Sequence, residues 1–99
     1  MRQSGRYLPE YQKLRRKFDV LTICKTPELS SFAALAPVKK LGVDAAIIFA
    51  DLMLPVEAMG VKFRIVEAIG PVVDNPVANL ADVKRLRLIN PTKDTSFVQ

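Results

Sequence analysis

The sequence has no histidine and only one cysteine, Cys24, among its 99 residues. A single thiol cannot form an internal disulfide, and without histidine the chain has no second soft ligand for zinc. The sequence therefore gives no support to metal or thiol chemistry. We expect Cys24 to be buried and unreactive.

Long apolar runs, internal repeats and glycine-rich phosphate loops are also absent from the sequence. The longest apolar run, residues 45–50, is far shorter than the ~20 residues that a transmembrane helix needs. No apolar stretch follows the basic start to form a signal peptide. With 49% hydrophobic and 25% charged residues, the composition predicts a soluble, globular chain of about one small domain in the cytoplasm, without a membrane partner.

A net charge of +5 raises the question of nucleic-acid binding. Four cations crowd one short segment: Lys13, Arg15, Arg16 and Lys17. No zinc-ligand spacing, aromatic RNA-binding motif or helix-turn-helix signature accompanies them. We interpret the segment as a solvated helix face, with a basic module that binds nucleic acid or an anionic membrane as the alternative.

The first half of the chain has the signals of two helices. Apolar residues at helical spacing and a proline in the first turn predict a helix over residues 9–17. A longer helix is predicted from Pro27, with Thr26 as its cap. Pro37 should kink or interrupt it, because the proline ring removes one backbone hydrogen bond. Gly42 should end it.

The period of the apolar residues changes after this second helix. Residues 43–51, "VDAAIIFAD", form an apolar run typical of a strand buried on both faces of a parallel sheet. Asp51 stands at the carboxyl end of this predicted strand, the end at which α/β sheets and barrels bind their ligands. The side chain could equally cap a helix over "LMLPVEAMG". Both interpretations of Asp51 stay open on the residues alone.

The second half has weaker signals. Residues 61–66 alternate apolar and charged side chains, and a turn at Gly70-Pro71 would join them to 72–74 in a ribbon outside the main sheet. Asn79 and Asp82 can cap a short helix through Leu86. Its apolar residues should face inward: Leu80, Val83 and Leu86. Residues 90–97 are expected to form a loop that leads into another helix.

The opening "MRQSGRYLPEYQKLR" resembles the signature of the uroporphyrinogen decarboxylase family, R-Q-A-G-R-Y-L-P-E-Y followed by an arginine. "CKTPEL", "APVKKLGVDAAIIFADLMLPVEAMG" and a later "GP" follow in the order of that family. Ser4 stands where the family usually has alanine, and Ala50 where it has serine. The resemblance implies an α/β fold, a partial (β/α)8 TIM barrel that covers the first barrel units with a small β-ribbon insertion. Residues 1–99 would be the incomplete N-terminal part, about the first quarter, of a single barrel domain.

This resemblance also implies an activity, a substrate and an assembly. Members of the family decarboxylate the four acetate side chains of uroporphyrinogen III to give coproporphyrinogen III in heme biosynthesis. They do so without a metal or another cofactor. The resemblance implies that this carboxy-lyase activity needs the complete barrel, and that the full-length protein is a cytoplasmic homodimer that does not bind nucleic acid.

Site residues follow from the same resemblance. Asp51 would be catalytic and would also bind the substrate. The other expected substrate-binding residues are Arg2, Gln3, Ser4, Gly5, Arg6 and Arg15. Guanidinium groups suit a substrate with many carboxylates, because they bind carboxylate in a bidentate manner. Two alternatives remain, a related zinc- and corrinoid-dependent methyltransferase barrel, which generally lacks the arginine loop, and the basic anion-binding module.

Overall fold

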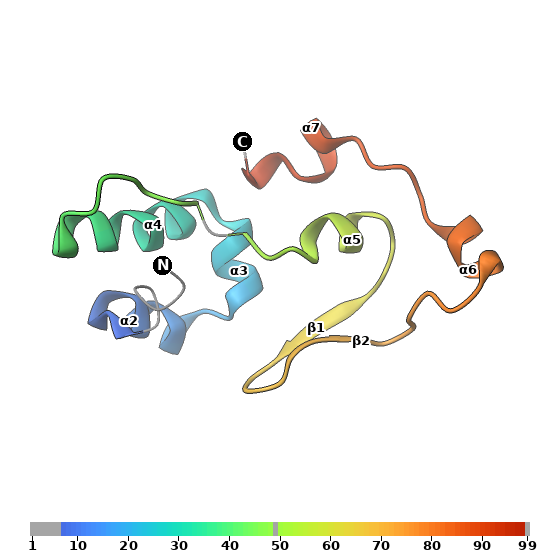
Figure 1. Cartoon of the computed structure of the whole chain (residues 1–99), viewed down its shortest axis with the longest axis horizontal. Coiled ribbons are helices and arrows are strands. Elements are labelled where there is room, and N and C mark those ends of the chain that lie inside the picture. The colour runs from blue at the N-terminus through green and yellow to red at the C-terminus, as the bar shows by residue number, and fades with distance from the viewer. Residues whose placement is uncertain (1–6, 49, 99) are drawn as a thin grey trace. The chain divides into compact units, whose positions relative to one another are not determined.

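The structure is a computed structural model that describes residues 7–48 and 50–98. These residues divide into two compact units, the first ending at Ala50 and the second spanning Asp51–Phe97 (Figure 1). Lysine and arginine equal aspartate and glutamate in number over residues 51–99, so residues 1–50 carry the whole net charge of +5. The part of the chain that forms the first unit is therefore its basic part.

The first unit is made of helices (Figure 1). They are α2 (Pro9–Lys17), α3 (Val20–Lys25) and α4 (Pro27–Leu41). Helix α4 packs against both α2 and α3, and an ion pair of 3.1 Å between Glu10 and Lys40 joins α2 to α4. The buried residues of the unit are Leu8, Ile23, Cys24, Ser30, Ala34 and Ala36. The predicted burial of Cys24 is confirmed.

Both predicted helices of this unit are present. Helix α4 has Thr26 at its N-cap position, although the threonine side chain makes no cap hydrogen bond. It ends at Gly42, which has a φ of 63° and donates its backbone N–H to the Val38 carbonyl at 3.0 Å. The predicted interruption at Pro37 is wrong, since α4 is one continuous helix, whereas the alternative of a kink there stays a prediction. Proline removes only one backbone hydrogen bond, and packing against two neighbouring helices keeps the rest of α4 helical.

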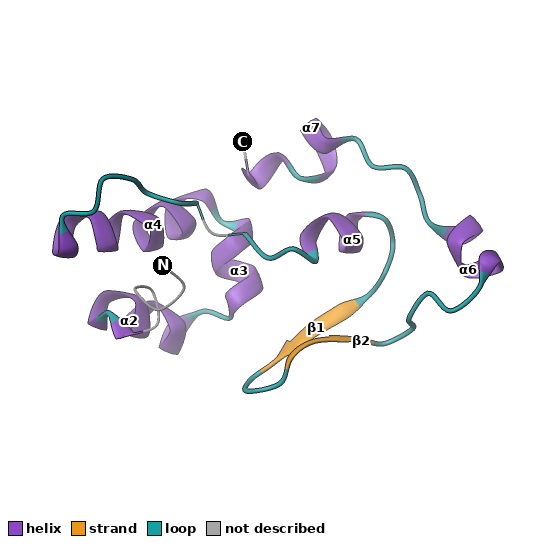
Figure 2. Ribbon diagram, viewed as in Figure 1, coloured by secondary structure: helices purple, strands orange, loops and turns teal. Residues whose placement is uncertain are grey.

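A strand over residues 43–51 is not observed. Residues 43–48 and 50 form no strand (Figure 2), and Ile47 and Ile48 are 65% and 61% exposed. A strand buried on both faces needs hydrogen-bonding partners on its edges and helices over its faces. Among the described residues the only strands pair with each other, so this apolar segment has no sheet to join.

The second unit contains a β-hairpin and several short helical segments (Figure 2). In chain order the elements after Ala50 are α5 (Leu54–Ala58), β1 (Phe63–Val66), β2 (Gly70–Val73), α6 (Leu80–Arg85), α7 (Pro91–Asp94) and the 3-10 helix η1 (Ser96–Val98). The strands are antiparallel, with Phe63 opposite Val73 and Val66 opposite Gly70. The predicted β-ribbon is confirmed.

The turn of the hairpin lies earlier than predicted. Ile69 donates its backbone N–H to the Val66 carbonyl at 3.2 Å, which closes the turn. Ala68, within this turn, has a φ of 66°. Gly70 and Pro71 already belong to β2. The positive φ that a tight turn requires is therefore taken by an alanine, which carries no sequence signal for it.

The predicted short helix after Asn79 is α6, but its packing differs from the prediction. Leu80 and Val83 are 73% and 50% exposed, and only Leu86 is half-buried. The helix buries none of its residues, and a capping box stabilises its first turn. The prediction of a loop over residues 90–97 is wrong, because Pro91–Asp94 form α7 and Ser96–Val98 form η1. None of the described helices is both long and apolar enough to cross a membrane.

Candidate functional site

The predicted arginine loop lies outside the described residues. Its members are Arg2, Gln3, Ser4, Gly5 and Arg6. Their expected role in substrate binding therefore stays a prediction from the sequence. The two remaining candidates, Arg15 and Asp51, are both described.

Arg15 lies in the last turn of α2. Its Nη1 donates a hydrogen bond of 3.1 Å to the backbone carbonyl of Phe18, just beyond the helix. A cation at this position also interacts favourably with the negative end of the helix dipole. An arginine has five N–H donors, so this local contact leaves donors for a carboxylate ligand. The substrate-binding role of Arg15 stays a prediction.

Asp51 lies in the turn that leads into α5. Its Oδ1 accepts a hydrogen bond from the backbone N–H of Met53 at 2.8 Å. Its backbone carbonyl accepts one from Leu54 N–H at 3.1 Å. The carboxylate thus stabilises the first turn, as the capping interpretation expected, although Met53 holds the N-cap position.

The same geometry leaves part of the Asp51 carboxylate available. The side chain is only half-buried, and among the described residues no donor contacts its second oxygen, Oδ2. A carboxylate oxygen can accept hydrogen bonds from ligand N–H groups and stabilise a nearby positive charge. Arg15 lies in the first compact unit, and Asp51 lies in the second.

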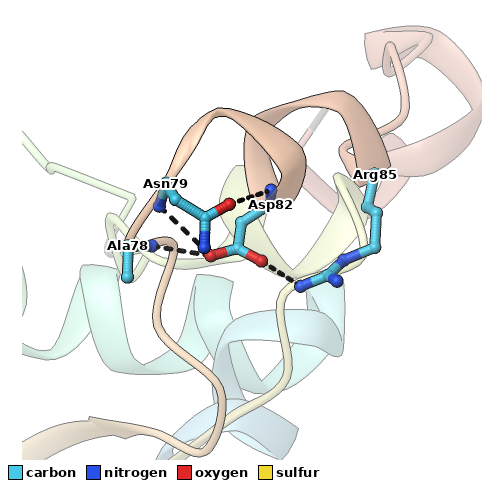
Figure 3. Close-up of polar contacts among 4 residues, drawn as sticks. All are labelled: Ala78, Asn79, Asp82 and Arg85. Carbon is cyan, nitrogen blue, oxygen red and sulfur yellow. Dashed lines mark hydrogen bonds and ion pairs between the residues drawn. The ribbon is translucent and has the colours of Figure 1, made fainter.

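A second polar cluster caps α6 (Figure 3). Asn79 Oδ1 accepts the backbone N–H of Asp82 at 3.1 Å, and Asp82 Oδ2 accepts those of Ala78 and Asn79 at 3.0 and 3.2 Å. The other oxygen of Asp82 forms an ion pair with Arg85. The Ala78 N–H chiefly, and Arg85, lower the pKa of the Asp82 carboxyl against the effect of desolvation. The sequence prediction of Asn79 and Asp82 as cap residues is confirmed.

Helix α6 also forms one wall of a hollow of about 520 Å³ in the second unit. The other walls come from residues 60–62 and 75–77. Charged side chains of both signs line it, because Lys62 and the Asp82–Arg85 pair are all among its lining residues. Asp51 does not line this hollow. The hollow is therefore separate from the predicted catalytic carboxylate.

The helical unit has a smaller hollow of about 110 Å³ along α4. Apolar Phe32, Leu35 and Ala36 line it together with Glu10 and two lysines of α4. Glu10 Oε2 is shielded from solvent there and accepts no hydrogen bond from a described residue. Across the part of the chain that the structure describes, no group of three or more histidine, cysteine, aspartate or glutamate residues could hold a metal ion.

Sequence reasoning missed two local features of the described residues. One is α3, whose start is capped by Asp19 through a 3.0 Å hydrogen bond from Thr22 N–H. An aspartate before an apolar stretch is the signal that could have found it. The other is the contact of 3.1 Å between Arg87 and Asp94, which helical periodicity does not predict because Arg87 lies in a loop and Asp94 in α7.

Comparison with known proteins extends over the whole chain. The family model described as uroporphyrinogen decarboxylase (URO-D) matches residues 1–99. The chain is 53% identical over 98 residues to the uroporphyrinogen decarboxylase of Carboxydothermus hydrogenoformans. It is 54% identical over 98 residues to that of Geobacter metallireducens, and 53% identical over 93 residues to that of Thermodesulfovibrio yellowstonii.

These matches cover nearly all of this chain but a minor part of each relative. They include 99%, 99% and 94% of the chain, respectively, and 28% of the length of each relative. The chain therefore spans little more than a quarter of the curated relatives that it matches. Since the family model covers every residue of the sequence, the chain belongs to the uroporphyrinogen decarboxylase family.

Proposed function

We propose that this chain is the N-terminal part of a uroporphyrinogen decarboxylase. The complete enzyme would remove the acetate carboxyl groups of uroporphyrinogen III and form coproporphyrinogen III in heme biosynthesis. The observation that carries the proposal is the family match over residues 1–99. Because the chain spans 28% of its relatives, the activity is assigned to the complete protein and not to this segment.

The proposed fold of the complete protein is a single (β/α)8 barrel. In it, residues 43–51 would form a strand, because neighbouring strands would supply the hydrogen bonds that the exposed Ile47 and Ile48 segment lacks among the described residues. Asp51 would then lie at the carboxyl end of that strand, where barrel enzymes place their active sites. The two units described here would be parts of one domain.

Substrate binding is assigned to the arginine loop. Uroporphyrinogen carries acetate and propionate carboxylates on all four pyrrole rings, and Arg2 and Arg6 would bind them as planar, permanently charged forks. Gly5 would let the backbone turn closely between them. Gln3 and Ser4 would offer their backbone N–H groups, and Arg15 would be a further cation for the same carboxylates.

Asp51 is assigned to the centre of the tetrapyrrole. The pyrrole N–H groups converge there, and a carboxylate can accept several of them. Protonation of a pyrrole ring at carbon makes the ring cationic. The bond between the acetate methylene and its carboxyl group then breaks, its electron pair flows into the ring, and CO2 leaves. The exocyclic methylene that remains takes up a proton to become a methyl group, and the ring carbon releases the proton that it had gained. Asp51 would stabilise that cation as it forms, while Met53 N–H holds the other carboxylate oxygen.

The proposed protein works without a metal or another cofactor, as a cytoplasmic homodimer. It needs no nucleic acid or membrane partner. Its ligand is the tetrapyrrole, whose negative charge complements the net charge of +5 carried by residues 1–50.

A chimeric enzyme tests this proposal. The chain would replace its matching segment in the Carboxydothermus relative, to which it is 53% identical, and the purified chimera would be assayed for coproporphyrinogen formation. We expect decarboxylation by the chimera and none by the separate 99-residue chain. A folded chimera without activity, or turnover by the chain alone, would contradict the proposal.

A further inference from the structure

The segment that follows α6 has little apolar burial. Among residues 87–97 the only buried side chain is that of Thr95. The backbone N–H of Arg87 donates to the carbonyl of Met59, just after α5, at 3.1 Å. We name residues 87–95 the strap. This hydrogen bond attaches the start of the strap to the end of α5, within the same unit.

The carboxylate of Asp94 contacts two other residues of the strap. Its Oδ2 accepts the backbone N–H of Asn90 at 2.8 Å, and its Oδ1 accepts Nη2 of Arg87 at 3.1 Å. Arg87 therefore contacts the end of α5 through its backbone and α7 through its side chain. The carboxylate is well placed to hold both ends of the strap, since its own side chain is only 20% exposed.

Asp82 offers a comparison within the same unit. It also accepts the backbone N–H of its N-cap residue and also pairs with an arginine. Its partner Arg85, however, lies on the same helix, α6. The charge of Asp82 therefore stabilises one helix, whereas the charge of Asp94 acts on a segment anchored elsewhere in the unit.

We propose that Asp94 is a latch, whose ionised carboxylate keeps the strap closed on α5 through Arg87. When the charge is lost, α7 opens and Arg87 leaves Met59. Segments with few buried side chains open at low free energy, so the two contacts of this carboxylate bear on the closed state, beside the cap that Asn90 Oδ1 forms with Thr92 N–H at 3.1 Å. The strap is then a conformational device that responds to acid.

The electrostatics of Asp94 agree with this role. The Asn90 N–H first, and then the hydrogen bond and charge of Arg87, lower the pKa of the Asp94 carboxyl against desolvation. Arg87 is the charged group that faces it, as Arg85 faces Asp82. A lowered pKa in the closed state means that ionisation favours closure. Closure is fully supported above the ordinary pKa of 3.8 and is lost as the pH falls through the lowered value.

Amide hydrogen exchange of the chimera that carries this chain in the Carboxydothermus relative, followed by NMR and corrected for intrinsic rates, tests the latch. The reporters are the Arg87 amide, bonded to Met59, and the Thr95 amide, bonded to Pro91. In Asp94→Asn at neutral pH we expect protection at both reporters to fall by at least about tenfold. Below pH 3.8 the unmodified chimera should lose the same protection, and the variant should change little.

Two further variants separate the latch from simple helix capping. Asp82→Asn should lower protection of the Val83 amide, which is bonded to Asn79, and leave Arg87 and Thr95 unchanged. Arg87→Gln keeps its backbone N–H but loses the guanidinium, so it should reproduce Asp94→Asn. The double variant Asp94→Asn with Arg87→Gln should lose little more protection than either single variant, because both substitutions remove the same contact between Arg87 and Asp94.

The proposal fails on any of three results. The first is an Arg87 amide that keeps its protection in Asp94→Asn. The second is a set of additive effects of Asp94→Asn and Arg87→Gln on the reporters. The third is an absence of protection at both reporters in the unmodified chimera at neutral pH, which would mean that the strap is not closed.

Discussion

The Asp51 carboxylate and the backbone N–H of Met53 are joined by a hydrogen bond of 2.8 Å. Asparagine can accept the same hydrogen bond, so Asp51→Asn should keep the turn and the fold. It cannot stabilise a cationic pyrrole. In the active chimera we therefore expect kcat/KM to fall by at least about a hundredfold, measured by steady-state kinetics alongside thermal unfolding.

Asp51→Glu is the matched variant. It keeps the charge but moves the carboxylate by one methylene group, so part of the activity should remain. If Asp51→Asn unfolds at the same temperature as its parent and turns over at a similar rate, Asp51 has no part in the mechanism and its role is limited to the turn.

The arginine loop gives a second prediction. Arg6→Lys keeps the charge but loses the planar fork, so the chimera should bind uroporphyrinogen more weakly by about 1 to 3 kcal/mol. Arg2→Lys should behave alike. Arg16→Lys, on the exposed side of α2, is the control and should change nothing. If Arg2→Lys and Arg6→Lys, like Arg16→Lys, bind the substrate as tightly as the parent chimera does, Arg2 and Arg6 belong to the solvated surface.

A third prediction concerns the acid stability of α3. Thr22 donates to Asp19 from its hydroxyl and its backbone N–H, and these contacts lower the pKa of the Asp19 carboxyl. The stabilisation is complete above the ordinary pKa of 3.8 and is lost as the pH falls through the lowered value. Asp19→Ala should cost about 0.5 to 2 kcal/mol at pH 7 in urea unfolding.

Asp19→Asn separates the charge from the cap. Asparagine caps a helix as well as aspartate does, so this variant should be nearly as stable as the parent at neutral pH. Its free energy of unfolding should fall less than that of the parent between neutral and strongly acidic pH. An identical pH dependence in the two proteins would rule out Asp19 as a source of acid sensitivity.

The hairpin turn gives the fourth prediction. Ala68 has a φ of 66°, which is unfavourable for a residue with a Cβ and acceptable for glycine. Ala68→Gly should raise the free energy of unfolding by about 0.5 to 1 kcal/mol. Ala81→Gly, within helix α6, should lower it by about 1 kcal/mol. Denaturant unfolding of both variants checks the opposite signs, and a destabilised Ala68→Gly would contradict the strained turn.

The features that the sequence predicted well are those with local causes. The proline at the start of α2 and the glycine after α4 act within one or two turns of the helix, so their effect does not depend on distant residues. The cap formed by Asn79 and Asp82 is local in the same way. The strand over residues 43–51 was mispredicted because a strand depends on partners elsewhere in the chain.

The candidate site was predictable to different extents. The capping contact of Asp51 follows from its position two residues before the amide that it accepts. Its proposed catalytic role came from the resemblance to the family, since nothing local pairs it with the arginine loop. The contact between Arg87 and Asp94 was not predicted, because only the path of the loop between α6 and α7 brings the two side chains together.

The exposed segment around Ile47 and Ile48 has a consequence for handling the separate chain. Residues 45–48 are exposed, form no strand and make no backbone hydrogen bond to another described residue. An extended apolar segment with unsatisfied backbone groups can pair edge to edge with the same segment of another molecule. The chain on its own should therefore aggregate in a concentration-dependent manner, through the segment that would become a buried strand in the complete barrel.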